Sequence, residues 1–252
     1  MIKFFRNIRK KLLAEGKTTN YLKYAIGEIV LVVIGILIAL QVNNWNETRK
    51  LNNERTKLVK ELISDFKITK SRLSESIEYG RNTNKNTDAF LSLSEEDILT
   101  IPIDSLANLT GYFFDKIDFE PMLATYNRIL SSGTKNLIEN DSLFKLFPDF
   151  FQAFDSYKLH DNLGGDLVYK GSTWELRRTL GSLNVLNRNQ QYPKSFELSE
   201  KQYRNLLLQK NVYATCENMA WIFRNILNKL VDMDIATDKI LIQLKKSLKQ
   251  ND

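Results

Sequence analysis

The feature that most constrains this chain is an apolar stretch near its amino terminus, residues 24–42, which reads YAIGEIVLVVIGILIALQV. Twelve of its nineteen residues are Ile, Leu or Val, and Glu28 and Gln41 are its only strongly polar residues. At ~1.5 Å per residue, a helix of this length roughly matches the ~30 Å hydrocarbon core of a bilayer. Each Ile, Leu or Val favours insertion by about 0.3 to 0.6 kcal/mol at the helix centre. We therefore predict a transmembrane helix over residues 24–42.

The alternative for this stretch is a buried core strand or helix, because the uninterrupted apolar run from Ile29 to Leu40 is short and rich in β-branched side chains. Aromatic residues nevertheless flank both ends, with Tyr24 before the run and Trp45 after it, as in the headgroup layer of a membrane. A signal peptidase site would need a second small residue after Ala39, which is absent. The sequence therefore favours an uncleaved span.

Charge is distributed unevenly along the chain. Seven Lys and Arg stand against two Glu in the first 42 residues, so five of the six net positive charges lie there. The positive-inside rule then predicts a cytoplasmic amino terminus in a bacterial inner membrane, with residues 43–252 as a periplasmic domain. Because the remaining 210 residues are nearly neutral, no nucleic-acid partner is predicted.

Residues 1–23 form a basic, amphipathic tail. Its apolar residues recur at helical spacing, with Arg6, Arg9, Lys10 and Lys11 on the other face. One interpretation is a short helix lying on the anionic membrane surface, and the other is a loosely ordered positive tail that only orients the span. Both interpretations predict that this tail lies at the cytoplasmic face.

Within the span, Glu28, Gly35 and Ala39 follow one another at steps of seven and four, which places them on one helix face. A carboxylate inside lipid is costly unless it reaches the interface, is protonated or is paired. Two small residues four apart permit close approach of another helix. This face could contact a second copy or another membrane protein; alternatively, Glu28 reaches the interface beside Lys23 and the small residues are incidental.

Two parts of the sequence resemble a large bacterial family of unknown function. The opening MIKFFRNIRKKLLAEGK with YAIGEIVLVVIGILIALQVNNWNE is similar to the start of that family, and FEPMLATYNRILSSGTKNLIENDSLFKLF is similar to its middle. The resemblance implies a membrane protein with one span and a helical soluble part. It implies no catalytic residues.

Beyond the span, residues 43–252 are predicted to be all-α. Leu51, Leu58, Leu62, Phe66, Leu73 and Ile77 recur at helical steps, and no Pro or Gly occurs between Gln41 and Tyr79, so the span is expected to continue outward as a stalk. A second run without Pro or Gly carries a heptad-like seam, formed by Cys216, Ala220, Phe223, Leu227, Leu230, Leu241, Leu244 and Leu248. We expect this last helix to pack antiparallel to the stalk-derived helix of residues 46–93. Asp234 and Thr237 interrupt the seam, either setting its register or facing water.

Between these long helices the sequence indicates short elements. Ser94 before three acidic residues predicts a helix start, Pro121 is expected in the first turn of a helix to about Ser132, and Gly133 is expected to end it in the left-handed conformation. An aromatic stripe at helical spacing follows, formed by Leu143, Phe144, Phe147, Phe150, Phe151, Phe154 and Tyr157. It favours core packing over a hydrophobic ligand groove, although Pro148 could split its helix. Gly164-Gly165 is expected to form a turn. Residues 81–88 are expected to be either a hydrated helix surface or the far tip.

Candidate catalytic residues are few. The single His, His160, precedes Asp161, but a hydrolase would also need a nucleophile and an oxyanion site. The single Cys, Cys216, lies on the apolar seam and is expected to be a small buried hydrophobic residue, with an intermolecular disulfide as the alternative. No cofactor and no metal are predicted, since paired cysteines and His clusters are absent from the sequence.

These observations favour a membrane-anchored, non-enzymatic protein that binds, senses or assembles through a periplasmic helical bundle. Its expected partners are the lipid bilayer and, through the span, a second copy or another membrane protein. The alternative is a membrane-anchored enzyme that uses carboxylates.

Overall fold

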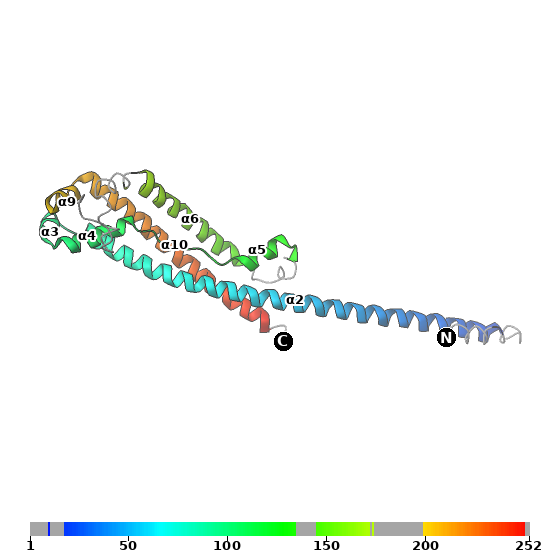
Figure 1. The fold of residues 1–252 in the computed structure, drawn as a ribbon. Coiled ribbons are helices and arrows are strands. Elements are labelled where there is room, and N and C mark those ends of the chain that lie inside the picture. Colours follow the sequence, from blue (N-terminus) through cyan, green and yellow to red (C-terminus); the bar gives the residue numbers. More distant parts are fainter. Residues whose placement is uncertain (1–9, 11–17, 135–144, 172, 174–198, 250–252) are drawn as a thin grey trace. The chain divides into compact units, whose positions relative to one another are not determined.

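The computed structural model describes residues 10, 18–134, 145–171, 173 and 199–249, and every regular element in this part of the chain is a helix (Figure 1). The chain divides into two compact units, residues 1–57 and 58–252. α2, Thr18–Leu91, begins in the first unit and continues into the second. The last helix, α10, is Lys210–Lys249. The predicted all-α fold with long first and last helices is confirmed.

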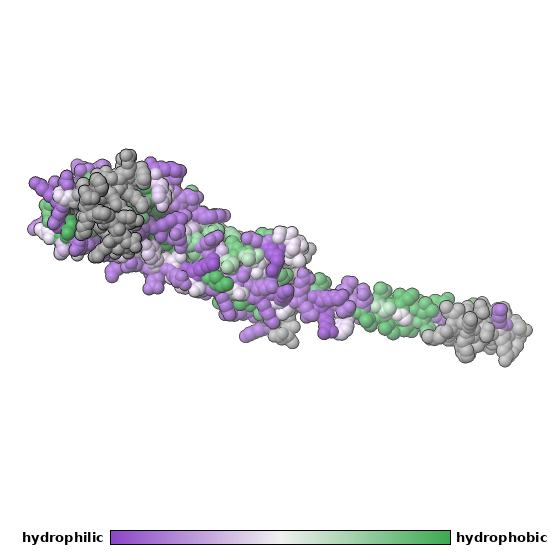
Figure 2. Space-filling model, viewed as in Figure 1, coloured by the Kyte–Doolittle hydropathy of each residue, from purple (hydrophilic) through white to green (hydrophobic). Residues whose placement is uncertain are grey.

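In the first unit, the predicted span is an α-helix whose side chains are exposed on every side. Between residues 22 and 54 only Ala25 and Glu28 are even partly covered. This helix is long and apolar enough to cross a membrane. Figure 2 shows its hydrophobic residues as a band on the amino-terminal part of the chain. Its length and composition are therefore those of a possible membrane span.

In the second unit, α10 packs against α6, Phe147–Lys170, and against the part of α2 from Leu58 onward. Polar contacts between α2 and α10 run in opposite directions along the two helices: Lys70 meets Asp238, and Asp88 meets Arg224. The predicted antiparallel pairing of the stalk-derived helix and the last helix is therefore confirmed.

The predicted seam of α10 lies in the core. Leu227 and Leu248 are partly buried, and the other members are almost fully buried: Cys216, Ala220, Phe223, Leu230, Leu241 and Leu244. At Gly80 of α2, an added Cβ would lie 3.3 Å from Leu227 Cδ1, so this glycine permits close approach of the two helices. A shorter helix, α9, Glu200–Leu207, precedes α10, and the break at Leu208 and Gln209 was not predicted.

Short elements connect α2 to α6: α3, Glu95–Thr100, α4, Ile103–Gly111, the 3-10 helix η1, Tyr112–Phe114, and α5, Ala124–Ser131. The predicted cap at Ser94 is confirmed, because its side chain and that of Asp97 bond reciprocally to each other's backbone N–H. Hydrogen bonds from the Ser94 hydroxyl and from the Ser94 N–H lower the pKa of the Asp97 carboxyl. Gly133 follows α5 with φ of 70°, as predicted for its end.

Two local predictions were wrong, and a third held in part. Pro121 does not begin α5, because residues 115–123 are not helical and the helix starts only at Ala124. Gly164 and Gly165 form no turn but lie inside α6, where an added Cβ at Gly164 would already contact Ile222 of α10 at 3.4 Å. Residues 81–88 are helical as one interpretation had it, but they are not simply hydrated, since Thr83 and Thr87 are fully buried.

The aromatic stripe packs in the core, as favoured from the sequence. Phe147, Phe150 and Tyr157 are buried, and Pro148 lies in the first turn of α6 without splitting it. Phe66 of α2 packs against this stripe, with its ring centroid 5.7 Å from those of both Phe147 and Phe150. The two neighbouring stripe positions in the sequence, Leu143 and Phe144, lie outside the described residues.

Candidate functional site

A non-helical segment, residues 115–123, which we call the strap, and the start of α5 are held against α2 by a column of polar side chains. The column residues are three or four positions apart and so lie on one helix face. Asp65 accepts a hydrogen bond from the Thr125 N–H at 2.8 Å, and Thr69 accepts one from the Met122 N–H at 3.0 Å. Further along α2, Arg72 donates to the Glu120 carbonyl at 2.9 Å and Ser76 donates to the Asp118 carbonyl at 2.8 Å. The last member, Tyr79, donates to the Asp115 carboxylate at 2.8 Å. Four of these five contacts use main-chain atoms of the partner.

The other side of the strap is fixed by Tyr157 of α6. Its hydroxyl donates to the Ile117 carbonyl and accepts from the Phe119 N–H, each at 2.9 Å. The ring of Tyr157 packs edge-on against that of Phe119, with centroids 5.9 Å apart. Burial raises the pKa of the Tyr157 hydroxyl, with the nearby Asp161 charge as a further cause. This tyrosine is therefore a neutral structural anchor.

The strap alternates between buried and exposed side chains. Ile117, Phe119 and Pro121 point into the core, and the residues between them are exposed: Lys116, Asp118 and Glu120. This period of two is the mark of an extended chain with one buried face. The sequence DKIDFEP carried this signal beside the polar column on α2, and our reading of the sequence missed both.

The exposed side of the strap forms one wall of a cleft of about 610 Å³ in the second unit. Phe119, Phe154 and Tyr157 supply an aromatic floor. Charged side chains of both signs surround it: Arg72 and Glu75 from α2, Lys116, Asp118 and Glu120 from the strap, and Lys158 and Asp161 from α6. This volume lies within the range of small-molecule sites, which is about 300 to 1,000 Å³.

Lys116 links two walls of the cleft. Its ammonium lies 2.8 Å from Asp118 on the strap and 3.5 Å from Asp161 on α6. The hydrogen bond to Asp118, helped by the charge of Asp161, outweighs partial burial and raises the pKa of Lys116. Because both carboxylates and the ammonium are at least partly exposed, a ligand with complementary charges could exchange with these contacts at modest cost.

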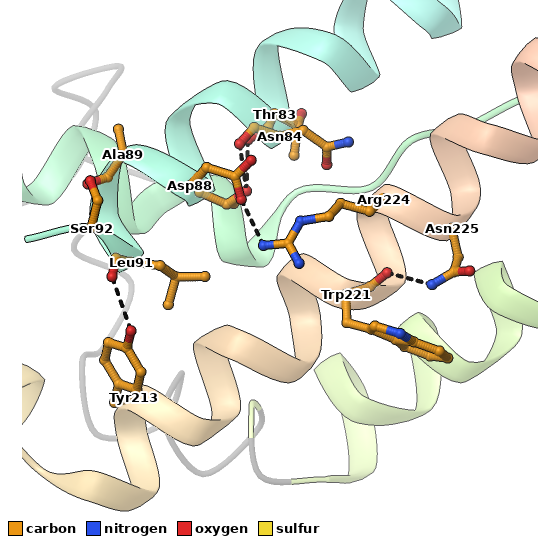
Figure 3. Close-up of polar contacts among 11 residues, drawn as sticks. Thr83, Asn84, Asp88, Ala89, Leu91, Ser92, Tyr213, Trp221, Arg224 and Asn225 are labelled. Carbon is orange, nitrogen blue, oxygen red and sulfur yellow. Dashed lines mark hydrogen bonds and ion pairs between the residues drawn. The ribbon is translucent and has the colours of Figure 1, made fainter.

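A second set of polar contacts joins α2 to α10 (Figure 3). Arg224 donates to the Asp88 carboxylate at 2.7 Å, and the Tyr213 hydroxyl donates to the Leu91 carbonyl at 2.9 Å. Further along, Lys70 lies between Asp234 at 2.8 Å and Asp238 at 2.7 Å. Burial opposes the charge of Lys70, but the hydrogen bonds and charges of the two aspartates outweigh it and raise the pKa of Lys70. Asp234, which interrupts the apolar seam of α10, thus pairs with Lys70 of α2. Thr237, which also interrupts the seam, is fully buried.

The candidate catalytic residues do not form one centre. His160 Nδ1 lies 2.8 Å from the Ser156 carbonyl of its own helix, and its ring is 5.8 Å from that of Trp221. The adjacent Asp161 instead faces Lys116 in the cleft. Cys216 is buried, and this burial raises the pKa of its thiol to about 12. Within the described residues, no three His, Cys, Asp or Glu side chains are placed to share a metal ion.

The predicted contact face of the span lies in the first unit. Glu28 is partly covered, Ala39 is exposed, and an added Cβ at Gly35 would meet no atom within 4 Å. Of the predicted membrane-surface residues, Lys10 is an exposed helical residue, whereas Arg6, Arg9 and Lys11 lie outside the described residues.

Comparison with protein families bears on α2, the strap and α5 together. Residues 28–142 match the model of a family of unknown function, DUF6090. The matched range begins inside the predicted span and includes the whole polar column and the strap. The expected resemblance to an uncharacterised family is thereby confirmed. Comparisons with curated proteins and with solved structures found no match.

Proposed function

We propose that this protein is a single-span membrane protein whose helical unit binds a ligand or partner without catalysing a reaction. The observation that carries the proposal is the apolar helix of residues 24–42, which is exposed on every side and continues as α2 into a packed helical unit. Leaving one large apolar side chain in water rather than burying it costs about 1.5 to 3 kcal/mol. Twelve such residues in one helix favour lipid as its surroundings.

The charge distribution supports one orientation in that membrane. The excess of Lys and Arg before the span favours a cytoplasmic amino terminus in a bacterial inner membrane. Residues 1–23 are then the cytoplasmic tail, residues 24–42 the span, and residues 43–252 the periplasmic domain.

The cleft beside the strap is the proposed binding site. Its aromatic floor and its rim of both charges suit a small molecule or peptide that carries apolar and charged groups. The alternative, an enzyme using carboxylates, would draw on the same cleft, where Asp118 and Asp161 share Lys116.

Alkaline carbonate washing of membranes tests the anchor. We expect the full-length chain to stay in the membrane pellet, and the double variant Ile34→Asp/Ile36→Asp to be released, since each central charge costs about 2.5 to 3.5 kcal/mol. Leu51→Asp, in the exposed polar part of α2, is the matched control and should stay in the pellet. Release of the wild-type chain would refute the proposal.

Protease added to intact spheroplasts tests the orientation. Cleavage after residue 43 before lysis is expected for a periplasmic domain. Protection until the cells are lysed would establish the opposite orientation.

The span face is proposed to contact a second copy or another membrane protein. Gly35→Leu and Glu28→Leu should change the partners or the oligomer size recovered in mild detergent, whereas Val33→Leu, on the other side of the helix, should not. An unchanged pattern in all three variants would remove this contact from the proposal.

A further inference from the structure

The cleft beside the strap holds an ammonium group of the protein itself against an aromatic ring. Lys158 Nζ lies 4.7 Å from the ring centroid of Phe154, within the ~6 Å over which a cation is attracted to the face of such a ring. The same ammonium pairs with Asp155 at 2.8 Å, one turn earlier on α6. Because the Lys158 and Asp155 side chains are 51% and 71% exposed, an external cation could replace this ammonium at modest cost.

A second ammonium group of the protein lies in the same cleft. Lys116 Nζ is 2.8 Å from Asp118 on the strap and 3.5 Å from Asp161 on α6. The cleft therefore already holds two primary ammonium groups, one against an aromatic ring and one between two carboxylates. These are the two kinds of surroundings that attract ammonium ions in proteins.

The charged groups of the cleft favour a further cation over an anion. Among the described residues that line it, four are carboxylates and three are basic. Each basic side chain has a partner: Arg72 donates to the Glu120 carbonyl at 2.9 Å, and both lysines are paired with aspartates. The carboxylates of Glu75 and Glu120, in contrast, form no ion pair within the described part of the chain. An anion would have to take a basic side chain from its partner, whereas a cation meets two carboxylates without a cationic partner.

We propose that the cleft binds a small aliphatic amine in its ammonium form, which takes the place of the Lys158 ammonium over the ring of Phe154. This inference rests on the proposed function, in which the cleft is the binding site, and names the class of its ligand. Lys158 keeps Asp155 as its partner when it leaves the ring. The volume of about 610 Å³ accommodates a small molecule.

Isothermal titration calorimetry of the full-length chain in dodecyl maltoside tests the charge of the ligand. The probe is n-butylammonium, which has the structure of a lysine side chain without its backbone. We expect it to bind, and 1-butanol, which has a similar size and an uncharged hydroxyl, to bind much more weakly. Equal affinities for the two molecules would overturn the proposal, as would the absence of butylammonium binding.

A lysine substitution tests the position of the amine. Lys158→Gln should tighten butylammonium binding about two- to fivefold, because it removes a competing cation that makes an exposed contact with the ring. Lys170→Gln is the matched control: Lys170 also pairs with an aspartate one turn earlier on α6, Asp166 at 2.9 Å, but it lies outside this cleft. It should leave the affinity unchanged. Equal effects of the two substitutions would overturn the position given to the amine.

Two further variants test the ring and the rim. Phe154→Leu and Glu120→Gln should each weaken butylammonium binding, whereas Phe151→Leu should not, because Phe151 is another half-buried aromatic residue of α6 that does not line the cleft. Circular dichroism checks that each variant is folded. Glu120 is exposed, so Glu120→Gln provides the test even if Phe154→Leu fails to fold. An unchanged affinity in Glu120→Gln and in any folded Phe154→Leu protein would overturn the proposal.

Failure of this inference can be distinguished from failure of the proposed function. If butylammonium and 1-butanol bind equally and Phe154→Leu weakens both, the cleft remains a binding site and the preference for a cation is refuted. If carbonate releases the wild-type chain from membranes while butylammonium still binds it in detergent, the anchor is refuted and the amine site stands.

Discussion

At the scale of single residues, Arg204 shows how a buried charge can stabilise backbone far away in sequence. Its guanidinium donates to the carbonyl of Ile101 at 2.7 Å and to that of Ile98 at 2.5 Å, and it pairs with Glu200 at 2.6 Å. The two carbonyls belong to the end of α3, where helices leave carbonyls without internal partners. Helical periodicity places Arg204 on α9 but gives no sign of this contact, because it joins residues about a hundred positions apart.

Replacing Arg204 by Met should lower the free energy of unfolding by about 2 to 4 kcal/mol, since two carbonyls would lose a charged donor in a buried place. Arg224→Met is the control, because Arg224 and Asp88 form an exposed pair worth about 1 kcal/mol or less. Urea denaturation followed by circular dichroism measures both. Similar losses for the two variants would contradict the role given to Arg204.

Cys216 should make stability depend on alkaline pH. Its thiol pKa is raised by burial from 9.0 to about 12, so the folded state favours the neutral thiol. Below about pH 9 neither state ionises it; as pH rises above that value the unfolded state gains a thiolate that the folded state does not, and the free energy of unfolding falls. The wild type should therefore lose more stability than Cys216→Ala between about pH 9 and pH 11. Parallel pH profiles for the two proteins would show that the thiol is not protected.

At the scale of elements, the confirmed predictions depend on residues that are close in sequence or that repeat at a regular spacing. The cap at Ser94, the end of α5 at Gly133 and the seam of α10 each follow from residues within a few turns of one another. The strap could not be predicted from such local patterns, because its contacts join residues about 40 to 60 positions apart. Gly164 was misread for the same reason: the demand for a small residue comes from Ile222 on another helix.

Thr69 should be the most sensitive residue of the polar column. It is fully buried, and its hydroxyl accepts from the Met122 N–H at 3.0 Å. Thr69→Val keeps the shape but leaves that N–H unpaired, so the free energy of unfolding should fall by about 1 to 3 kcal/mol. Thr48→Val, whose hydroxyl bonds only to its own exposed helix, should change it by less than about 0.5 kcal/mol. Thermal and urea unfolding would compare them, and equal effects would argue against the column.

At the scale of the whole molecule, the core of the second unit is formed by residues from Leu58 onward. The sequence predicted a span and a bundle but not where the bundle begins along α2, because the amphipathic pattern of the stalk continues on both sides of Leu58. The boundary depends on which turns of α2 find partners in α6, α10 and the strap.

A chain that starts at Leu58 should therefore fold alone. We expect a helical circular dichroism spectrum, cooperative urea unfolding and no retention by membranes, because the exposed apolar helix has been removed. A non-cooperative transition would show that the preceding residues are needed for the fold.

The strap is fastened almost wholly through its peptide groups, while Lys116, Asp118 and Glu120 project into the cleft. These three side chains can therefore change during evolution without loss of the main-chain contacts that hold the strap. Related chains could share one scaffold and still recognise chemically different molecules.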